Sequence, residues 1–312
     1  MRGMRRLLPV LFLLAAAALF LVGCGGQRQQ VPGASGSRGK GLVMLDIGHF
    51  VGGEGACSPF SMNGKVLREC AFWYQYSYFV KKELEAAGYR CVVTNRGNAP
   101  TSSPLADYAK RARVVHLNHP DKNAARYPSR YFADRVGSGV ISADAAIRMK
   151  ADCAVFLHLN SSGGATSGGS NGLVICNRYN GRPLGEALCR AFNRHLLNSA
   201  MPNGGRTCSV QVRYVDADRS AAWMNACDDA GIPAAVTEVA FVNNRDHARF
   251  LTTEAGARRL AHTVALGIID FMKHRSSSPR HKRSNPNAPD EGSFGYAAES
   301  RRLNVPGAKH LL

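Results

Sequence analysis

The stretch G-L-V-M-L-D-I-G-H, residues 41–49, decides how the rest of the sequence is interpreted. Four apolar residues precede Asp46 and glycines bound the run, which is the pattern of a strand buried on both faces of a sheet. Gly48 permits a sharp turn, and His49 follows it at once. Open α/β sheets bind ligands beyond the carboxyl ends of their strands, so we expect His49 to lie at such a site.

Two further apolar runs repeat this arrangement. Residues 153–159, C-A-V-F-L-H-L, carry His158 near their end, and residues 234–239, A-A-V-T-E-V, carry Glu238. Other strands are expected over 42–46, 91–94, 173–176 and, at a sheet edge, 210–215; helices are expected over 66–87, 105–115, 142–150 with Ser142 as N-cap, 184–199, 220–230 and 255–274. Strands that alternate with helices predict a single α/β domain with a mostly parallel sheet.

Glu69 lies at an unexpected place in the helix predicted over 66–87. The apolar stripe of this helix consists of Trp73, Tyr76, Val80, Leu84 and Ala87. Extending the stripe back by one turn reaches Glu69. Burying an unpaired carboxylate costs several kcal/mol, so a buried Glu69 would need partners. Taken alone, Glu69 is better interpreted as a side chain that reaches solvent or pairs with Arg68 or Arg90.

The two histidines and Glu69 can converge at one end of the predicted sheet. Two imidazoles and a carboxylate with an open fourth position form a catalytic zinc site. Glu238 is then placed for proton transfer, and the apolar residues that follow it should partly desolvate its carboxylate and raise its pKa, as suits a base. The alternative for Glu238 is a salt bridge to Arg245 or Arg249.

Residues 118–145 are expected to form a mobile cover over or beside the substrate groove. The span is rich in proline and glycine, and a structureless segment of this length inside a domain is typical of a functional loop or lid. Around its start, His116, His119 and Asp121 could bind a second metal ion. Their proline-rich setting favours solvent-exposed side chains instead.

The amino-terminal residues indicate export. Arg2, Arg5 and Arg6 precede an apolar stretch over 7–22 that is short and ends in small residues, as in a secretory signal peptide. L-V-G-C at 21–24 resembles the lipobox of bacterial lipoproteins, which implies cleavage before Cys24 and lipidation of its thiol. The alternative is an ordinary signal peptide with an incidental cysteine.

The composition of successive segments predicts how the whole chain of 312 residues is organised. We expect a signal peptide over 1–23, a flexible tether over 24–40, a catalytic domain over 41–275 and a disordered basic tail over 276–312. The net charge of +18 favours anionic partners, and export argues for wall polymers and lipid and against nucleic acid. An exported, lipid-anchored protein would face the cell envelope; Gly25, rather than Asp, after the lipidated cysteine implies the outer membrane in a Gram-negative cell.

The sequence contains nine cysteines, which fits an oxidising compartment. Their spacing does not fix a disulfide pattern. The first pairs to test are Cys57 with Cys70 and Cys208 with Cys227. Three others are expected to be buried thiols because they lie in apolar strands: Cys91, Cys153 and Cys176.

The motifs quoted above resemble a known family. L-D-I-G-H at 45–49, Glu69 opening a helix, A-D-C-A-V-F-L-H-L-N-S at 151–161 and T-E-V-A-F-V-N-N at 237–244 are similar to those of zinc-dependent N-acetylmuramoyl-L-alanine amidases of the Amidase_3 type. The resemblance implies a six-stranded sheet flanked by helices. It also implies zinc ligands at His49, Glu69 and His158. Glu238 takes the place of the catalytic glutamate.

The sequence departs from the family pattern at three places. Ile47 stands where the family usually has proline, Phe50-Val51 where it has Gly-Gly, and F-L-H-L-N where it has S-I-H-A-N. None of the residues that differ from the family pattern is one of the implied ligands, and the histidine of F-L-H-L-N, His158, is retained.

The resemblance implies a reaction: hydrolysis of the amide bond between N-acetylmuramic acid and L-alanine, with Zn²⁺ as cofactor and peptidoglycan as substrate. Two alternatives stay open. A non-catalytic peptidoglycan-binding lipoprotein on an amidase fold would have lost a ligand or Glu238, and neither is lost. Another zinc hydrolase, such as a carboxypeptidase, is disfavoured because H-E-x-x-H is absent from the sequence.

Overall fold

The computed structural model describes residues 40–53, 55–117, 138–162, 171–197, 210–215 and 223–275. The predicted signal peptide with Cys24, nearly all of the predicted tether and the predicted tail lie outside the described residues, as do residues 118–137 of the predicted cover. In the part of the chain that is described, no helix combines the length and the hydrophobicity needed to cross a bilayer.

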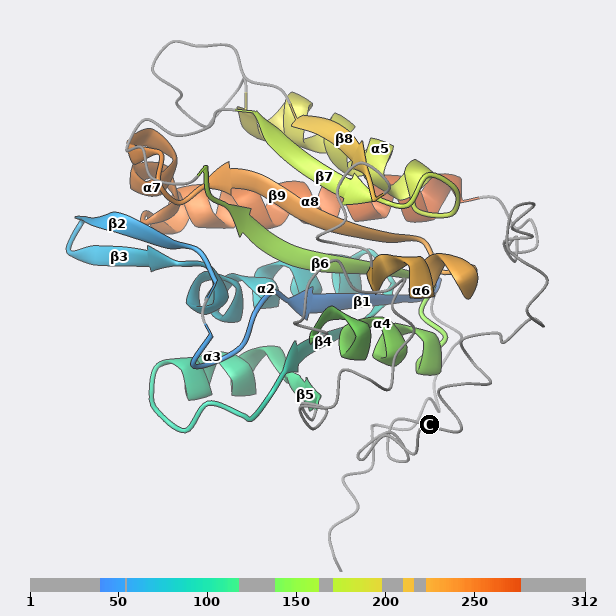
Figure 1. Cartoon of the computed structure of the whole chain (residues 1–312), viewed down its shortest axis with the longest axis horizontal. Coiled ribbons are helices and arrows are strands. Elements are labelled where there is room, and N and C mark those ends of the chain that lie inside the picture. Colours follow the sequence, from blue (N-terminus) through green and yellow to red (C-terminus); the bar gives the residue numbers. More distant parts are fainter. Residues whose placement is uncertain are drawn as a thin grey trace, which may run out of the picture. The chain divides into compact units, whose positions relative to one another are not determined.

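The centre of the described structure is a seven-stranded sheet (Figure 1). Its order is β5–β4–β1–β6–β9–β7–β8, and all neighbouring strands are parallel except β7 and β9, which are antiparallel. The strands are β1 (Leu42–Ile47), β4 (Arg90–Arg96), β5 (Val115–Leu117), β6 (Cys153–Asn160), β7 (Gly172–Cys176), β8 (Val210–Tyr214) and β9 (Ala234–Phe241). The mostly parallel α/β sheet is confirmed, with one strand more than the six expected; β8 is an edge strand, as predicted.

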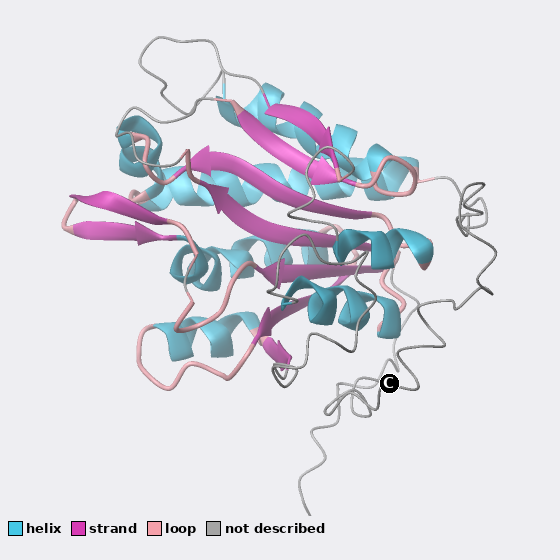
Figure 2. Ribbon diagram, viewed as in Figure 1, coloured by secondary structure: helices cyan, strands magenta, loops and turns pink. Residues whose placement is uncertain are grey.

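Helices cover both faces of this sheet (Figure 2). The described helices are α2 (Glu69–Ala86), α3 (Leu105–Ala112), α4 (Ser138–Arg148), α5 (Arg182–Phe192) with the π-helical turn η3 (Asn193–Leu197), α6 (Asn225–Asp229), α7 (Arg245–Leu251) and α8 (Glu254–His274). One core lies between the sheet and helices α2, α3, α5, α7 and α8. The other lies between the sheet and helices α4 and α6.

Strand β1 joins the two cores because its side chains alternate between them. Val43, Leu45 and Ile47 belong to the first core, and Met44 to the second. Each such buried side chain contributes about 1.5–3 kcal/mol of hydrophobic stabilisation. Asp46 is also buried, and its carboxylate accepts a hydrogen bond of 2.8 Å from the hydroxyl of Thr94. The prediction of a strand buried on both faces is confirmed along its whole length.

A β-hairpin precedes α2, and its second strand occupies the start of the helix predicted over 66–87. Strands β2 (Cys57–Met62) and β3 (Lys65–Arg68) pair antiparallel across the two-residue turn Asn63-Gly64. Both turn residues have positive φ, at 53° and 72°, which is the conformation that Asn-Gly favours in tight hairpins. Helix α2 therefore begins at Glu69, and the prediction of a helix from residue 66 is wrong.

Other helix boundaries also differ from the predictions. Helix α4 begins at Ser138, so Ser142 is buried inside it and is not its N-cap. The helix predicted over 105–115 ends at Ala112, because Arg113 adopts a left-handed conformation with φ 53° and leads into β5. Helix α7 was missed, although Asn244 caps its first turn by accepting hydrogen bonds from the backbone amides of Asp246 and His247.

The cysteines do not form the suggested pairs. Cys57, which is exposed, and Cys227, which is buried, are both free cysteines. Cys91 and Cys176 are buried free thiols as predicted, and burial raises the pKa of each to about 12. The sulfur of Cys153, also buried, lies 3.8 Å from that of Met272.

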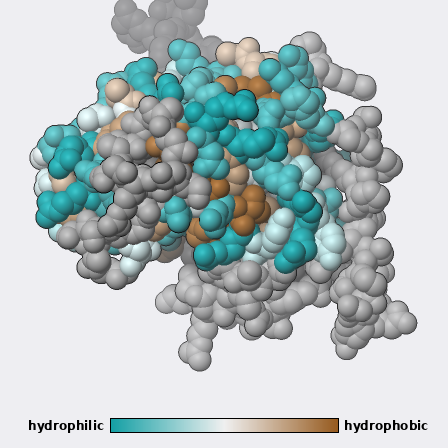
Figure 3. All heavy atoms as spheres, turned by 90° about the horizontal axis from the view of Figure 1, so that it is seen from above, coloured by the Kyte–Doolittle hydropathy of each residue, from teal (hydrophilic) through white to brown (hydrophobic). Residues whose placement is uncertain are grey.

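Among the described residues seen in Figure 3, hydrophilic ones cover most of the surface, and apolar ones reach it in smaller areas. Among the described residues, the large apolar side chains that are exposed are Val51, Val66 and Tyr179. Most large apolar side chains of the described residues therefore lie in the two cores.

Candidate metal centre

Three parallel strands bring the candidate side chains to one edge of the sheet. His49 lies two residues beyond β1, and His158 lies two residues before the end of the adjacent strand β6. Glu238 of β9 is the register partner of His158. The convergence of His49, His158 and Glu238 expected from the sequence is therefore present.

The turn that carries His49 is tightly packed against His158. The backbone amide of Gly48 donates a 3.0 Å hydrogen bond to the carbonyl oxygen of Leu157. A Cβ atom at position 48 would lie 2.7 Å from both that oxygen and the imidazole of His158, so the turn requires glycine. His49 itself has φ 64°, a left-handed conformation that costs a residue with a side chain about 1–2 kcal/mol. Surrounding contacts must hold it there.

Glu69 is buried at the start of helix α2, with 1% of its surface exposed. Its Oε2 accepts a hydrogen bond of 2.7 Å from the backbone amide of Ala56, and its Oε1 accepts one of 3.0 Å from that of Leu159. The interpretation of Glu69 as a side chain that reaches solvent is wrong, because hairpin and sheet backbone together provide the donors that a buried carboxylate needs.

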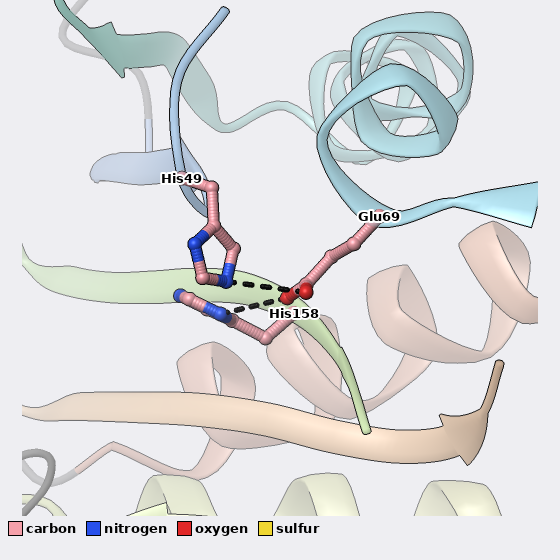
Figure 4. A group of neighbouring side chains, drawn as sticks. All are labelled: His49, Glu69 and His158. Carbon is pink, nitrogen blue, oxygen red and sulfur yellow. Dashed lines mark ion pairs between the residues drawn. The ribbon is translucent and has the colours of Figure 1, made fainter. Parts of the chain in front are cut away.

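Both histidines point at this carboxylate (Figure 4). His49 Nε2 lies 3.1 Å from Glu69 Oε2, and His158 Nδ1 lies 2.8 Å from Oε1. Burial alone would raise the pKa of Glu69, but hydrogen bonds and charge from His158 and His49 outweigh it and lower the pKa to about 2. Glu69 is therefore an ionised carboxylate at neutral pH, the form that binds metals.

The three side chains fit a metal ion. One ligand atom from each of His49, Glu69 and His158 lies within 4.8 Å of the others. Ligand atoms around a tetrahedral Zn²⁺, with bonds of about 2.0–2.1 Å, lie about 3.3 Å apart. The nitrogen–oxygen distances of 3.1 and 2.8 Å, one to each oxygen of Glu69, are a few tenths of an ångström shorter than this separation. Two imidazoles and one carboxylate leave a fourth position open for water or substrate.

Glu238 lies beside this trio, and its side chain is more accessible than those of Glu69 and His158. Its Oε1 is 3.7 Å from His158 Nδ1, and 21% of its side chain is exposed. The two arginines considered as its alternative partners make other contacts: Arg245 lies over the ring of Phe60 at 4.8 Å, and Arg249 pairs with Asp246 at 3.1 Å. A carboxylate in this position can exchange protons with a molecule bound next to the trio.

Several residues that support the centre were not foreseen from the sequence. The amides of Ala56 and Leu159 are backbone groups, so no side-chain pattern identifies them. The buried amide of Asn95 contacts the His49 turn, and a polar residue near the end of an apolar strand was the only available signal. Of the suggested second metal site, His119 and Asp121 lie outside the described residues. His116 is half-buried, which lowers its pKa, and its ring stacks on Tyr74 at 6.2 Å.

The sequence profile of the N-acetylmuramoyl-L-alanine amidase family, Amidase_3, matches residues 43–270. The chain belongs to this family. The matched interval contains the three candidate ligands and Glu238. The amidase hydrolyses the amide bond between N-acetylmuramic acid and L-alanine in peptidoglycan.

Three solved amidase structures are among those that align with this chain. AmiC2 of Nostoc punctiforme is 18% identical, with a TM-score of 0.48 and coverage of 76% of this chain and 99% of that one. The CwlD amidase of Clostridioides difficile, solved in complex with the GerS lipoprotein, is 15% identical, with a TM-score of 0.46 and coverage of 75% and 98%. Ami1 of Mycobacterium smegmatis is 16% identical, with a TM-score of 0.46 and coverage of 74% and 96%. Comparison with curated proteins gave no match.

Proposed function

We propose that the amidase is a zinc enzyme in which His49, Glu69 and His158 bind the ion and Glu238 is the general base. The observation that supports this most strongly is the buried Glu69, whose two oxygens each face one histidine at 3.1 and 2.8 Å. Two neutral nitrogen ligands and one carboxylate are a donor set that suits zinc. Glu238 approaches the same group without being part of its closest contacts.

Zinc, when bound, polarises the amide carbonyl and lowers the pKa of a bound water toward about 7. Glu238 accepts a proton from the attacking water and delivers it to the nitrogen of L-alanine as the amide bond breaks. Glu69 stays ionised because hydrogen bonds and charge from His158 and His49 lower its pKa. The amides of Ala56 and Leu159 also donate to its two oxygens. These two amides also fix the plane of the Glu69 carboxylate between the two imidazoles.

Glu238→Gln tests the division of roles. The substitution keeps the shape of the side chain and removes its ability to accept a proton, so kcat should fall by about 10² or more. Zinc content and melting temperature should stay close to those of the wild type. Glu186→Gln is the control, because Glu186 is a partly exposed residue of α5 paired with Arg182. Retained turnover in Glu238→Gln would reject the role of base.

We also propose that the amidase is an exported lipoprotein anchored to a membrane of the cell envelope through Cys24, the outer membrane if the cell is Gram-negative. The basic leader, the short apolar stretch and L-V-G-C at 21–24 support this. A metabolic fatty-acid probe should label the wild type and should not label Cys24→Ser, and the variant should no longer fractionate with membranes. Equal labelling of both proteins would show that Cys24 is not the lipidated residue.

A further inference from the structure

The turn that presents His49 is held from its far side by one buried amide. Asn95 lies on β4, is completely buried, and is the register partner of Ile47. Its side-chain nitrogen donates hydrogen bonds of 2.9 Å to the carbonyl oxygen of Ile47 and 2.8 Å to that of His49. A single amide therefore bridges the carbonyl groups of the two residues on either side of Gly48.

A second buried side chain fixes the orientation of this amide. The hydroxyl of Tyr74 donates a hydrogen bond of 2.7 Å to the side-chain oxygen of Asn95. The reverse orientation would place that oxygen against the two carbonyl oxygens of the turn, which can only accept. Tyr74 is completely buried on α2, the helix whose first residue is Glu69. The same helix thus supplies one candidate ligand and orients the support of another.

We propose that Asn95 is a positioning residue for His49, and that Tyr74 maintains Asn95 in the orientation in which it can act. The bridge from Ile47 to His49 holds His49 in its left-handed conformation and aims its Nε2 at Glu69. On the other side of the turn, Gly48 is pressed against His158 and Leu157. The turn that carries His49 is therefore held between β4 and β6. Asn95 and Tyr74 can act in this way without contacting the metal or the substrate.

This inference rests on the proposed role of His49 as a ligand, and it predicts a specific defect. Asn95→Asp preserves volume but replaces the double donor by a group that repels the two carbonyl oxygens. The turn should open and metal affinity should fall by about 10- to 100-fold, the usual effect of losing a group that orients a ligand. Tyr74→Phe leaves the amide in place without its hydroxyl partner, so it should weaken affinity less than Asn95→Asp.

Metal binding can be measured on the purified full chain without any peptidoglycan. The metal-free protein is titrated with Zn²⁺ against a chelating competitor, and with Co²⁺, whose visible absorption reports the geometry of its ligands. The control is Val93→Ala on the same strand, because Val93 is buried in the core beneath α2 and its truncation lowers stability without altering the turn. The control should bind both ions as the wild type does.

Weakened Zn²⁺ binding and an altered Co²⁺ spectrum in Asn95→Asp, with both preserved in Val93→Ala, support the proposal. Wild-type affinity and spectrum in Asn95→Asp overturn it. If Asn95→Asp does not fold, Asn95→Ser decides by the same criteria, because the serine hydroxyl is too short to bridge both carbonyls. A wild-type protein that binds neither ion would refute the zinc site itself, and this would be visible before any variant is compared.

Discussion

One methyl group added at Gly48 should disturb the geometry of the two histidine ligands, and this effect can be distinguished from a general loss of stability. In Gly48→Ala the new Cβ would lie 2.7 Å from the His158 ring and from the backbone oxygen of Leu157. Ordinary contacts begin near 3.4 Å, so ring or turn must move by about 0.7 Å. The backbone oxygen belongs to a central strand and cannot give way, so the shift falls on the two histidines.

The expected size of the effect follows from this displacement. Overpacking a well-packed site costs about 1–3 kcal/mol of unfolding free energy, and each kcal/mol lowers the melting temperature of a domain of this size by about 2–4 °C. A displacement approaching 1 Å at a catalytic group can cost about 10²-fold in rate. Zinc affinity should fall by about 10- to 100-fold, since the two imidazoles can no longer face Glu69 together.

Gly267→Ala provides a matched control. Its Cβ would lie 2.9 Å from Leu188 at the contact of α8 with α5, so it is also overpacked but belongs to a different part of the core. Both variants are measured by thermal unfolding in the metal-free state and by zinc titration against a chelator. Both should be destabilised, and only Gly48→Ala should lose zinc affinity. If the two variants bind zinc equally well, the close packing of the two histidines does not set the ligand geometry and the reasoning is wrong.

Three further predictions follow from particular residues. His158→Ala should lose zinc, since two remaining ligands cannot hold it, and its metal-free form should still melt cooperatively; full zinc occupancy would exclude His158 as a ligand. Asn244→Ala removes the cap of α7 and should lower the unfolding free energy by about 1 kcal/mol in chemical denaturation, and an unchanged midpoint would show that the cap is dispensable. His247 is completely buried, and burial lowers its pKa to about 4, so its stabilising contribution is complete above the unfolded pKa near 6.5 and is lost as the pH falls toward 4. Unfolding free energies of the wild type should therefore drop by up to about 3 kcal/mol more than those of His247→Asn across this window, and parallel curves would contradict the assignment.

The central strands could be predicted from sequence because burial on both faces leaves an unambiguous pattern. β1, β6 and β9 are nearly continuous apolar runs, and each has a polar side chain near or just beyond its carboxyl end, which located the end of the sheet where His49, His158 and Glu238 meet. Once three parallel strands were assigned, their common direction determined that these side chains would be neighbours.

The elements around the sheet were less predictable because their sequences satisfy more than one pattern. Residues 66–68, which belong to β3, were predicted to form the first turn of a helix, although Asn63-Gly64 just before β3 is a strong hairpin signal. Strand β5 has three residues, too few for a periodicity to be visible. Helix α4 begins with a serine–glycine pair, which is more typical of a loop. Its packing against α6 and the sheet depends on residues distant in the sequence, so the local pattern does not reveal it.

Glu69 illustrates the limit for the site itself. Glu69 lies on the buried stripe of α2, but burying an unpaired carboxylate is costly, so taken alone it was interpreted as a surface or salt-bridged side chain. Only the combination with two histidines suggested that it is a ligand. The groups that make its burial possible are the backbone amides of Ala56 and Leu159, and they become partners only when the hairpin folds back and β6 passes beside it. Asn95 likewise acquires its role from the register of β4 with β1.

The most direct test of a zinc-dependent amidase is to follow the scissile bond in a defined substrate. Purified amidase is stripped of metal with a chelator, dialysed and incubated with a muropeptide, and the products are identified by mass spectrometry. The metal-free enzyme should release no stem peptide, and one equivalent of Zn²⁺ should restore release of a peptide with a free L-alanine amino terminus. Full hydrolysis by metal-free enzyme, or cleavage at any other bond after zinc is restored, would contradict the account.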